Sequence, residues 1–590
     1  MRFVWAVAAF VLAALMIGAG IAQRTVFEGP TSASQAIEVA GEAPYVLIDG
    51  AVLNSHDGAQ TLRVQEDGTI FAAYGRTADL EQWLTKAEYT HVTEDAGEIA
   101  TATIAAADPP AADAEPLSPV DSDLWLDQFQ DDDVMITPLQ LPADMSLLVA
   151  TDGVAPAPSS LTVTWPVRSV TPWAGPLIIG GSIVLAAGIV LYLLGVRHAR
   201  RSKGPRRKGL PLPVTEPIDL SVEQADKGVI TAAPTRRQLS GGKRAFIAVP
   251  AVAVSALLFT GCTADAWPDL AASPTPSASA TVVVPEDQGS AVVTQAQAER
   301  IVGKIAAQVQ DADEAMDATA AAERLDGTAL AARETNYRLR AALPDQAASP
   351  AIPTGQLDVI LPEANDGWPR TFLAVAPGSG DASDVVMSVT QPDAWSPYKL
   401  TYVADLVTDP DLKLAPSYVG AIPIPSDSPF LSIAPENIAA AYADVMTKGA
   451  DSEFASSFDI DDDQFLTVID ADRANRLAAF NETGAETGTL TFSADAGTTT
   501  PVALATLDSG AIVAVTVNDH DTVTPTNADA VIKVDGNPIV QALAGTAQST
   551  TGFTTSYANQ LFFFVPSQSS HERIRLLGFM SDILDAKAVS

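Results

Sequence analysis

The chain has 590 residues, with 41 Pro, 38 Gly, a single Cys and a formal net charge of −38. Single hydrophobic cores stop growing at about 250–300 residues, so we expect several domains. The strongly negative charge excludes nucleic acid as a partner, because a polyphosphate would be repelled. One Cys excludes a scaffold of disulfides within the chain.

The first apolar run covers residues 3–22 and follows a single charged side chain, Arg2. Twenty residues at about 1.5 Å each reach across the hydrocarbon core of a bilayer, which favours a transmembrane anchor. A cleaved signal peptide is the alternative, because Gly20-Ile21-Ala22 ends in the small residues that signal peptidase accepts. Both interpretations export the segment that follows.

The second apolar run, residues 173–196, contains no charged side chain. Trp165 and Trp173 lie at one end and Tyr192 lies near the other, as is typical of aromatic side chains at a membrane interface. Of the next twelve residues, 197–208, seven are Lys or Arg. This pattern predicts a transmembrane helix rather than a buried helix of a soluble domain.

The third apolar run, residues 245–264, ends in Thr260-Gly261-Cys262. This end resembles the lipobox of bacterial lipoproteins, in which a small residue precedes a Cys that is lipidated after cleavage, although Phe259 departs from that pattern. Cys262 is therefore a lipidation candidate, and a plain transmembrane helix is the alternative. Residues 265–290 are rich in Ala, Ser, Pro and Thr, which is typical of a flexible tether.

The charges indicate how these runs cross the membrane. Residues 24–172 hold 5 Lys/Arg against 24 Asp/Glu, residues 197–244 hold 12 against 4, and residues 265–590 hold 16 against 44. By the positive-inside rule, the basic linker 197–244 and the N-terminus are cytoplasmic. Both large acidic segments are then expected outside.

The first exported segment, 24–172, is predicted to be a β-rich domain. Strand-like runs at Tyr45–Ile48, 61–64 and 69–74, separated by the turn signals Asp49-Gly50 and Asp67-Gly68, and a last run at Leu161–Trp165 predict strands. Asp67-Gly68 is expected to form a turn between the second and third strands, and Thr77 is expected to cap a short helix.

The second exported segment is predicted to have an α+β fold made of two similar halves, 291–430 and 431–590. Each half begins with helices and continues with antiparallel strands, an order typical of α+β domains. A helix pair laid across a curved sheet, as in NTF2-like domains, would account for each half. The expected helices lie at 291–343, with a break near 325–327, and at 435–448 and 462–480; the expected strands lie at 370–376, 385–390, 398–406, 488–493, 502–507, 511–517, 561–565 and 573–579.

The arrangement of spans, basic loop and Thr-Gly-Cys tether resembles a family of uncharacterised membrane proteins of high-GC actinobacteria. The resemblance also rests on three short stretches: Trp368-Pro369-Arg370-Thr371-Phe372, Pro397-Tyr398-Lys399-Leu400 and Arg575-Leu576-Leu577-Gly578-Phe579. Members are sometimes labelled glycosyltransferases, which implies an envelope glycan enzyme. The resemblance supplies no catalytic residue.

We assign no catalytic, cofactor-binding or metal-binding residue from the sequence. The five His residues do not form the i, i+4 pair of a helical metal site. The triplets Asp131–Asp133 and Asp461–Asp463 match Asp-x-Asp metal motifs, but the second is expected to lie at a helix N-terminus, where negative charge is favourable. Ser396 and Lys399 match Ser-x-x-Lys, but they lead into an expected strand rather than a helix.

Two functional hypotheses follow. The first is a membrane-anchored extracytoplasmic envelope protein with a non-catalytic binding or assembly role, whose partners are other envelope proteins or a cell-wall polymer. The second is an envelope glycan enzyme such as a glycosyltransferase. A cavity lined by convergent carboxylates or His would favour the enzyme, whereas an apolar cavity would favour binding.

Overall fold

The structure is a computed structural model that describes residues 2–201 and 292–589. Within these ranges some short stretches are not described: 28–29, 31, 40, 57, 96–97, 112–115, 168–171, 365–366, 379, 381 and 408–411. The third apolar run, the basic linker beyond residue 201, the tether and Cys262 all lie outside the described residues. The chain divides into two compact units, one made of residues 1–33 and 166–282 and the other of residues 34–165 and 283–590.

The described part of the first unit is a pair of long apolar helices, α1 (Arg2–Thr25) and α4 (Ala174–Arg201). Both have the length and composition to span a membrane. They pack against each other in opposite directions, so that the ring of Phe3 near the start of α1 lies 5.9 Å from the ring of Tyr192 near the end of α4. The helices therefore form an antiparallel hairpin.

Glycines of α4 allow the two helices to approach closely. Gly181, Gly188 and Gly195, spaced seven residues apart, all face α1. A Cβ atom added at Gly188 would lie 3.2 Å from the Cβ of Ala9, and one added at Gly181 would lie 2.7 Å from the side chain of Ile17. Small residues at a helix contact are typical of helix packing in membranes.

The second unit contains two large sheets and a small two-stranded one, and the first large sheet is formed by residues between 32 and 166. It has eight strands, in the order β1-β8-β3-β7-β2-β4-β5 with β6 paired to β3. Its elements are β1 (Ser32–Glu38), β2 (Tyr45–Ile48), α2 (Gly50–Leu53), β3 (Gln60–Arg76), α3 (Thr77–Leu84), β4 (Tyr89–Asp95), β5 (Glu98–Ile104), β6 (Asp127–Leu139), β7 (Met145–Ala150) and β8 (Ser160–Pro166).

Strand β2 and the last strand, β8, lie where the sequence predicts them, but two local predictions were wrong. The expected turn at Asp67-Gly68 lies inside β3, which accommodates Gly68 at φ 100° as an irregularity in its pairing with β6. Arg76 rather than Thr77 precedes helix α3, and the Thr77 hydroxyl donates to the carbonyl of Asp144 instead.

The C-terminal region has the α+β architecture that its sequence predicts. Its nine-stranded sheet has the order β13-β15-β18-β19-β12-β11-β10-β9, with β14 paired to β15, so strands from both predicted halves share one sheet. Its elements are α6 (Gln295–Ala315), α7 (Ala318–Ala322), α8 (Gly327–Ala342), β9 (Val359–Pro362), β10 (Arg370–Ala376), β11 (Val385–Gln391), β12 (Lys399–Leu406), α9 (Pro435–Lys448), η2 (Gly449–Asp451), η3 (Ala455–Ser457), α10 (Gln464–Thr483), β13 (Gly488–Ala496), β14 (Val502–Ala505), β15 (Ala511–Pro525), β16 (Ile532–Lys533), α11 (Pro538–Ala544), β17 (Gln548–Ser549), β18 (Phe553–Val565) and β19 (Arg575–Ala588).

This sheet curves into a nearly closed barrel. A short segment, residues 421–424, bridges the two ends of the curved wall. The amide of Ala421 donates to the carbonyl of Pro362 at the end of β9 (2.7 Å), and the amide of Ile424 donates to Ala503 in β14 (2.9 Å). Because these bonds connect β9 to β14, one face of the sheet becomes the interior of the barrel.

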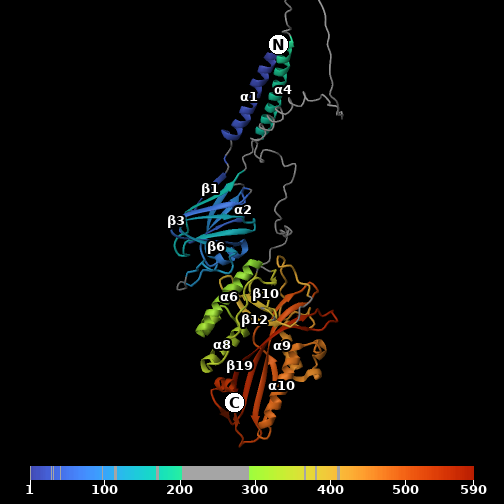
Figure 1. Ribbon diagram of the computed structural model, residues 1–590. Coiled ribbons are helices and arrows are strands. Elements are labelled where there is room, and N and C mark those ends of the chain that lie inside the picture. Colours follow the sequence, from blue (N-terminus) through green and yellow to red (C-terminus); the bar gives the residue numbers. More distant parts are fainter. Residues whose placement is uncertain are drawn as a thin grey trace, which may run out of the picture. The chain divides into compact units, whose positions relative to one another are not determined.

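Helices cover the outer face of the barrel wall (Figure 1). Helices α6, α7 and α8 pack on β10, β11 and β12 around buried residues such as Ile301 and Phe372. Helices α9 and α10 pack on β15 and β18 around Tyr442 and Phe563. The interior holds a separate apolar cluster that includes Leu373, Ile512, Phe562 and Leu577.

Candidate ligand-binding cavity

The barrel interior opens into a cavity of about 580 Å³. This volume is within the range of small-molecule pockets, and the mouth of a β-barrel is a common place for such a pocket. The lining residues are mostly aliphatic and come from β9, β10, β11, β12, β15, β18 and β19 and from the segment after β12. They are Asp358, Leu361, Leu373, Val375, Ala382, Ser383, Asp384, Val386, Leu406, Val407, Leu412, Leu414, Ile512, Phe562 and Leu577.

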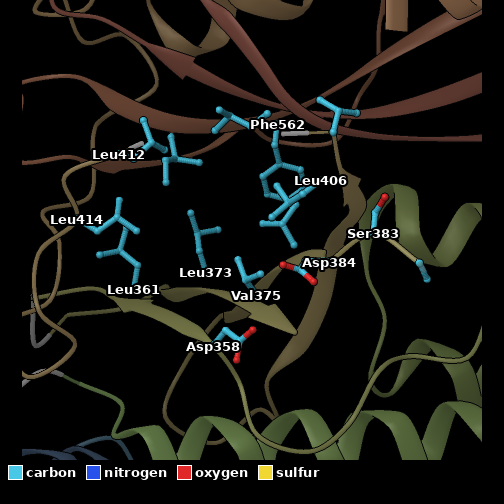
Figure 2. Close-up of a pocket in the computed structure, with 15 residues that line it drawn as sticks. Asp358, Leu361, Leu373, Val375, Ser383, Asp384, Leu406, Leu412, Leu414 and Phe562 are labelled. Atoms are coloured by element: carbon cyan, nitrogen blue, oxygen red, sulfur yellow. The ribbon is translucent and has the colours of Figure 1, made fainter. Parts of the chain in front are cut away.

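Figure 2 shows leucines on opposite walls directed toward a common space, with the ring of Phe562 above it and Val375 below it. Regular alternation along the strands places these side chains on the inner face: Leu373 and Val375 point inward from β10, whereas Phe372 and Ala374 pack under the helices. The cavity is therefore a product of barrel closure, not of one motif.

Three polar residues stand at the rim of this apolar space: Asp358, Ser383 and Asp384 (Figure 2). All three are exposed. One carboxylate oxygen of Asp384 accepts a hydrogen bond from the amide of Gly378 (2.9 Å), which holds the side chain in the β10–β11 connection. Of the described residues that line the cavity, none is Lys, Arg or His.

The opposite end of the barrel carries a buried ion pair to the first sheet. Arg370, at the start of β10, lies 2.8 Å from the carboxylate of Asp79 in helix α3, and both side chains are about 2% exposed or less. The guanidinium also lies 3.6 Å from the ring centroid of Trp368. The indole of Trp395 donates to the carbonyl of Trp83 at 2.9 Å.

A second buried carboxylate, Asp123, joins the same two regions. Its side chain is 1% exposed and pairs with the guanidinium of Arg324 and the ammonium of Lys304. It also accepts a hydrogen bond from the amide of Tyr398 at 3.0 Å. Gln297 of α6 donates to the carbonyl of Asp123 at 2.8 Å. Buried, partnered charges thus connect the two sheets of the second unit, beside an apolar cluster in which Ala394 and Trp395 pack with Trp83.

The residues that form the barrel and its helices match a known sequence family. Residues 290–588, a little over half of the chain, match the family described as a domain of unknown function (DUF8094). The chain belongs to this family. No curated protein and no solved structure matches the chain. The DUF8094 domain therefore includes the barrel, its cavity and one side of the contact with residues 34–165.

Glu363 is a buried acid of the DUF8094 domain and is 5% exposed. It follows β9 at the barrel end opposite the cavity mouth, where its backbone bridges to Ala421. Burial raises the pKa of Glu363 to about 7, against the opposing effects of a hydrogen bond from Thr371 and the charge of Arg370. Because its pKa is raised in the folded protein, ionisation of this side chain destabilises the folded state.

We expect Glu363→Gln to stabilise the protein at high pH by up to about 3 kcal/mol. A carboxyl whose pKa is higher when folded than when unfolded incurs no penalty below its unfolded value. The penalty grows as pH rises and is complete above about pH 7, so the parent loses stability over that window. Denaturant unfolding of the full-length protein at about pH 5 and pH 8 measures this. If the free energy of unfolding had the same pH dependence in Glu363→Gln and in the parent, the prediction would be contradicted. Glu572→Gln, at an exposed position, is the control and should behave as the parent.

The structure places the two Asp triplets in structural roles. Asp132 and Asp133 lie in β6, where they accept hydrogen bonds from the hydroxyl of Thr69 and the amide of Gly68, both at 3.1 Å. Asp463 caps α10 and accepts a hydrogen bond from the amide of Leu466 at 2.9 Å, as its predicted helix N-terminus requires. No group of three or more His, Cys, Asp or Glu side chains that could hold a metal ion was found among the described residues.

The Ser-x-x-Lys match has no catalytic geometry. Lys399 begins strand β12, as the sequence predicts, and its ammonium donates to the carbonyl of Ala322 at 2.7 Å. Among the His residues, His91 pairs with Asp49 at 2.7 Å, and the ring of His56 lies 5.0 Å from that of Trp165.

One constellation was not predicted: Ser556, His520 and Asp495 come together on three adjacent strands. The ring nitrogens of His520 lie 2.8 Å from the hydroxyl of Ser556 and 3.0 Å from the carboxylate of Asp495. These distances resemble those of a catalytic triad. However, Ser556 lies in β18, which pairs with β15 on one side and β19 on the other, so the ladder occupies backbone amides that an oxyanion hole would need. None of the three lines the barrel cavity, and we assign them a cross-strand structural role.

Proposed function

We propose that this protein is a membrane-anchored extracytoplasmic envelope protein. Its DUF8094 domain would bind the apolar part of a ligand and catalyse no reaction. The observation that carries the proposal is the cavity of about 580 Å³ inside the barrel, lined mainly by aliphatic side chains. Sugars are recognised through hydrogen-bonding groups, and few lining residues offer them. We therefore propose binding in preference to the alternative of a glycan enzyme.

The antiparallel pairing of α1 and α4 supports the proposed membrane topology. Opposite directions place the N-terminus and residue 198 on the same side and export residues 24–172 between the two spans. The basic linker 197–244 would then be cytoplasmic and residues 265–590 outside. We also propose that the two halves of the DUF8094 domain are NTF2-like and that the chain is a member of the actinobacterial membrane family.

Cysteine labelling tests this topology. In a Cys262→Ser background, a thiol reagent that does not cross membranes is expected to label His56→Cys and His571→Cys in intact cells. We expect His198→Cys to be labelled only after the membrane is opened, because it lies in the last turn of α4, next to the basic linker. Labelling of position 198 in intact cells would exclude the proposed orientation.

Chain-length dependence tests the binding function. We expect a homologous series of n-alkanols to bind the full-length protein with an affinity that rises about fourfold per added methylene until the cavity is full, because each buried methylene contributes about 0.8 kcal/mol. Titration calorimetry measures this, with protein-free detergent micelles as the baseline.

A matched pair of variants locates the bound chain. Val375→Phe fills the cavity and is expected to weaken binding, whereas Val468→Phe makes the same change at a position on α10 that is 53% exposed and should leave binding unchanged. An affinity that does not change with chain length, or that is the same in Val375→Phe as in the parent, would rule out the cavity as the ligand site.

A further inference from the structure

We propose that the ligand of the barrel cavity is a single-chain amphiphile whose polar end is cationic, an alkyl ammonium rather than an alkyl carboxylate. This inference rests on the proposed function, since it concerns the head of a ligand whose chain occupies the cavity. The lining separates into an aliphatic interior and a polar rim. An amphiphile with its chain inside must leave its head group at that rim.

The rim carries negative charge. Asp358 precedes β9 and Asp384 precedes β11, and both residues border the cavity, with Asp384 beside Val375 and Asp358 below it (Figure 2). Each position is bonded to a neighbouring strand: the amide of Asp358 donates to the carbonyl of Val375 in β10 at 2.9 Å, and the carbonyl of Asp384 accepts from the amide of Leu406 in β12 at 2.8 Å. The backbone of both residues is therefore fixed to the strands of the barrel mouth, and the amide of Gly378 also holds the carboxylate of Asp384.

The Lys residue closest in sequence to the lining residues pairs with an Asp outside the rim. Lys413 lies between two lining residues, Leu412 and Leu414, but its ammonium pairs with Asp508 at 2.9 Å. The hydroxyl of Ser383 adds a donor and acceptor beside the carboxylates. A cationic head is attracted to this rim and can donate to its oxygens, whereas an anionic head is repelled.

The test compares three heads on one chain length: an n-alkyl amine, the n-alkanol and the n-alkyl carboxylate, titrated into the full-length protein at neutral pH against protein-free micelles. We expect the amine to bind at least about tenfold more tightly than the carboxylate, with the alkanol between them. This preference should shrink as ionic strength rises, because the rim is exposed and salt screens it.

Two double variants separate the local rim from the overall negative charge of the chain. Asp358→Asn with Asp384→Asn should equalise amine and carboxylate, and Asn at 384 keeps an oxygen for the amide of Gly378. Asp461→Asn with Asp462→Asn removes the same charge at exposed positions outside the cavity lining and should leave the preference intact. If the double rim variant fails to fold, Asp358→Asn alone, which removes one of the two rim charges, should still lower the preference for the amine, and an unchanged preference would overturn the proposal.

The outcomes distinguish the two proposals. Failure of all three compounds to bind would overturn the proposed function. Binding of the alkanol together with equal or tighter binding of the carboxylate would leave the function standing and overturn only the cationic head group. Equal loss of preference in both double variants would also overturn it, because the attraction would then come from the whole chain.

Discussion

Replacing Arg370 with alanine is expected to lower the free energy of unfolding by about 3–5 kcal/mol, because it leaves a buried carboxylate without its closest cation. Asp79 is 2% exposed, and the other cation beside it, Arg76, lies 3.6 Å away against 2.8 Å for Arg370. The variant also removes the guanidinium that stacks on Trp368. Denaturant unfolding of the full-length protein, followed by tryptophan fluorescence, measures the change.

Arg573→Ala is the matched control for this prediction. Arg573 is about half exposed and lies 3.8 Å from Asp459, so its loss should cost less than about 1 kcal/mol. The double replacement Arg370→Met with Asp79→Leu should recover part of the lost stability, because it removes both buried charges together. An unfolding midpoint for Arg370→Ala equal to that of Arg573→Ala would show that the ion pair does not hold the two sheets.

Features of the fold that depend on local sequence could be predicted. Helix α9 begins at Pro435 and ends at Lys448 as expected, since proline at the first helical position and glycine after the last are local signals. The break between α7 and α8 lies at Asp326-Gly327, where Asp326 accepts from the amide of Gly327 and Gly327 has φ 54°. These signals need no distant partner.

The long strands were predicted too short, because their far halves are polar. Strand β15 was expected to end at Val517 but continues to Pro525 through two aspartates. Asp residues are depleted in strands, so the pattern indicates a loop. Asp519 is fully buried and is paired with Arg473 of α10, while Asp521 pairs with Arg476. Tertiary ion pairs thus override the local preference.

The cavity could not be predicted for a related reason. Its walls come from seven strands, and its closure depends on residues 421–424, which have no strand-like pattern but bond to β9 and β14. The sequence shows apolar runs in these strands and cannot show that the inner face leaves a space. The same holds for the contact between Asp79 and Arg370, which are far apart in the chain.

That contact bears on the proposed cleavage at Cys262. Cutting between Gly261 and Cys262 would divide the chain into two polypeptides, one carrying residues 34–165 and the other the DUF8094 domain. The structure joins these parts by Arg370–Asp79, by Asp123 with Arg324 and by further hydrogen bonds from α6. A covalent link is therefore not what holds them together.

We expect the two polypeptides to remain associated after the chain is cut, whether by lipoprotein processing or by a site-specific protease at a site inserted after Cys262. Tags at both termini report cleavage by immunoblotting, and gel filtration in detergent then reports whether the fragments elute together. In the parent, the N-terminal fragment should elute together with the C-terminal fragment. With Arg370→Ala it should be released, because breaking a buried pair at an interface costs several kcal/mol and mainly speeds dissociation, whereas Arg573→Ala should behave as the parent. Separation of the cut parent would mean that the buried charges do not hold the contact without the connecting chain.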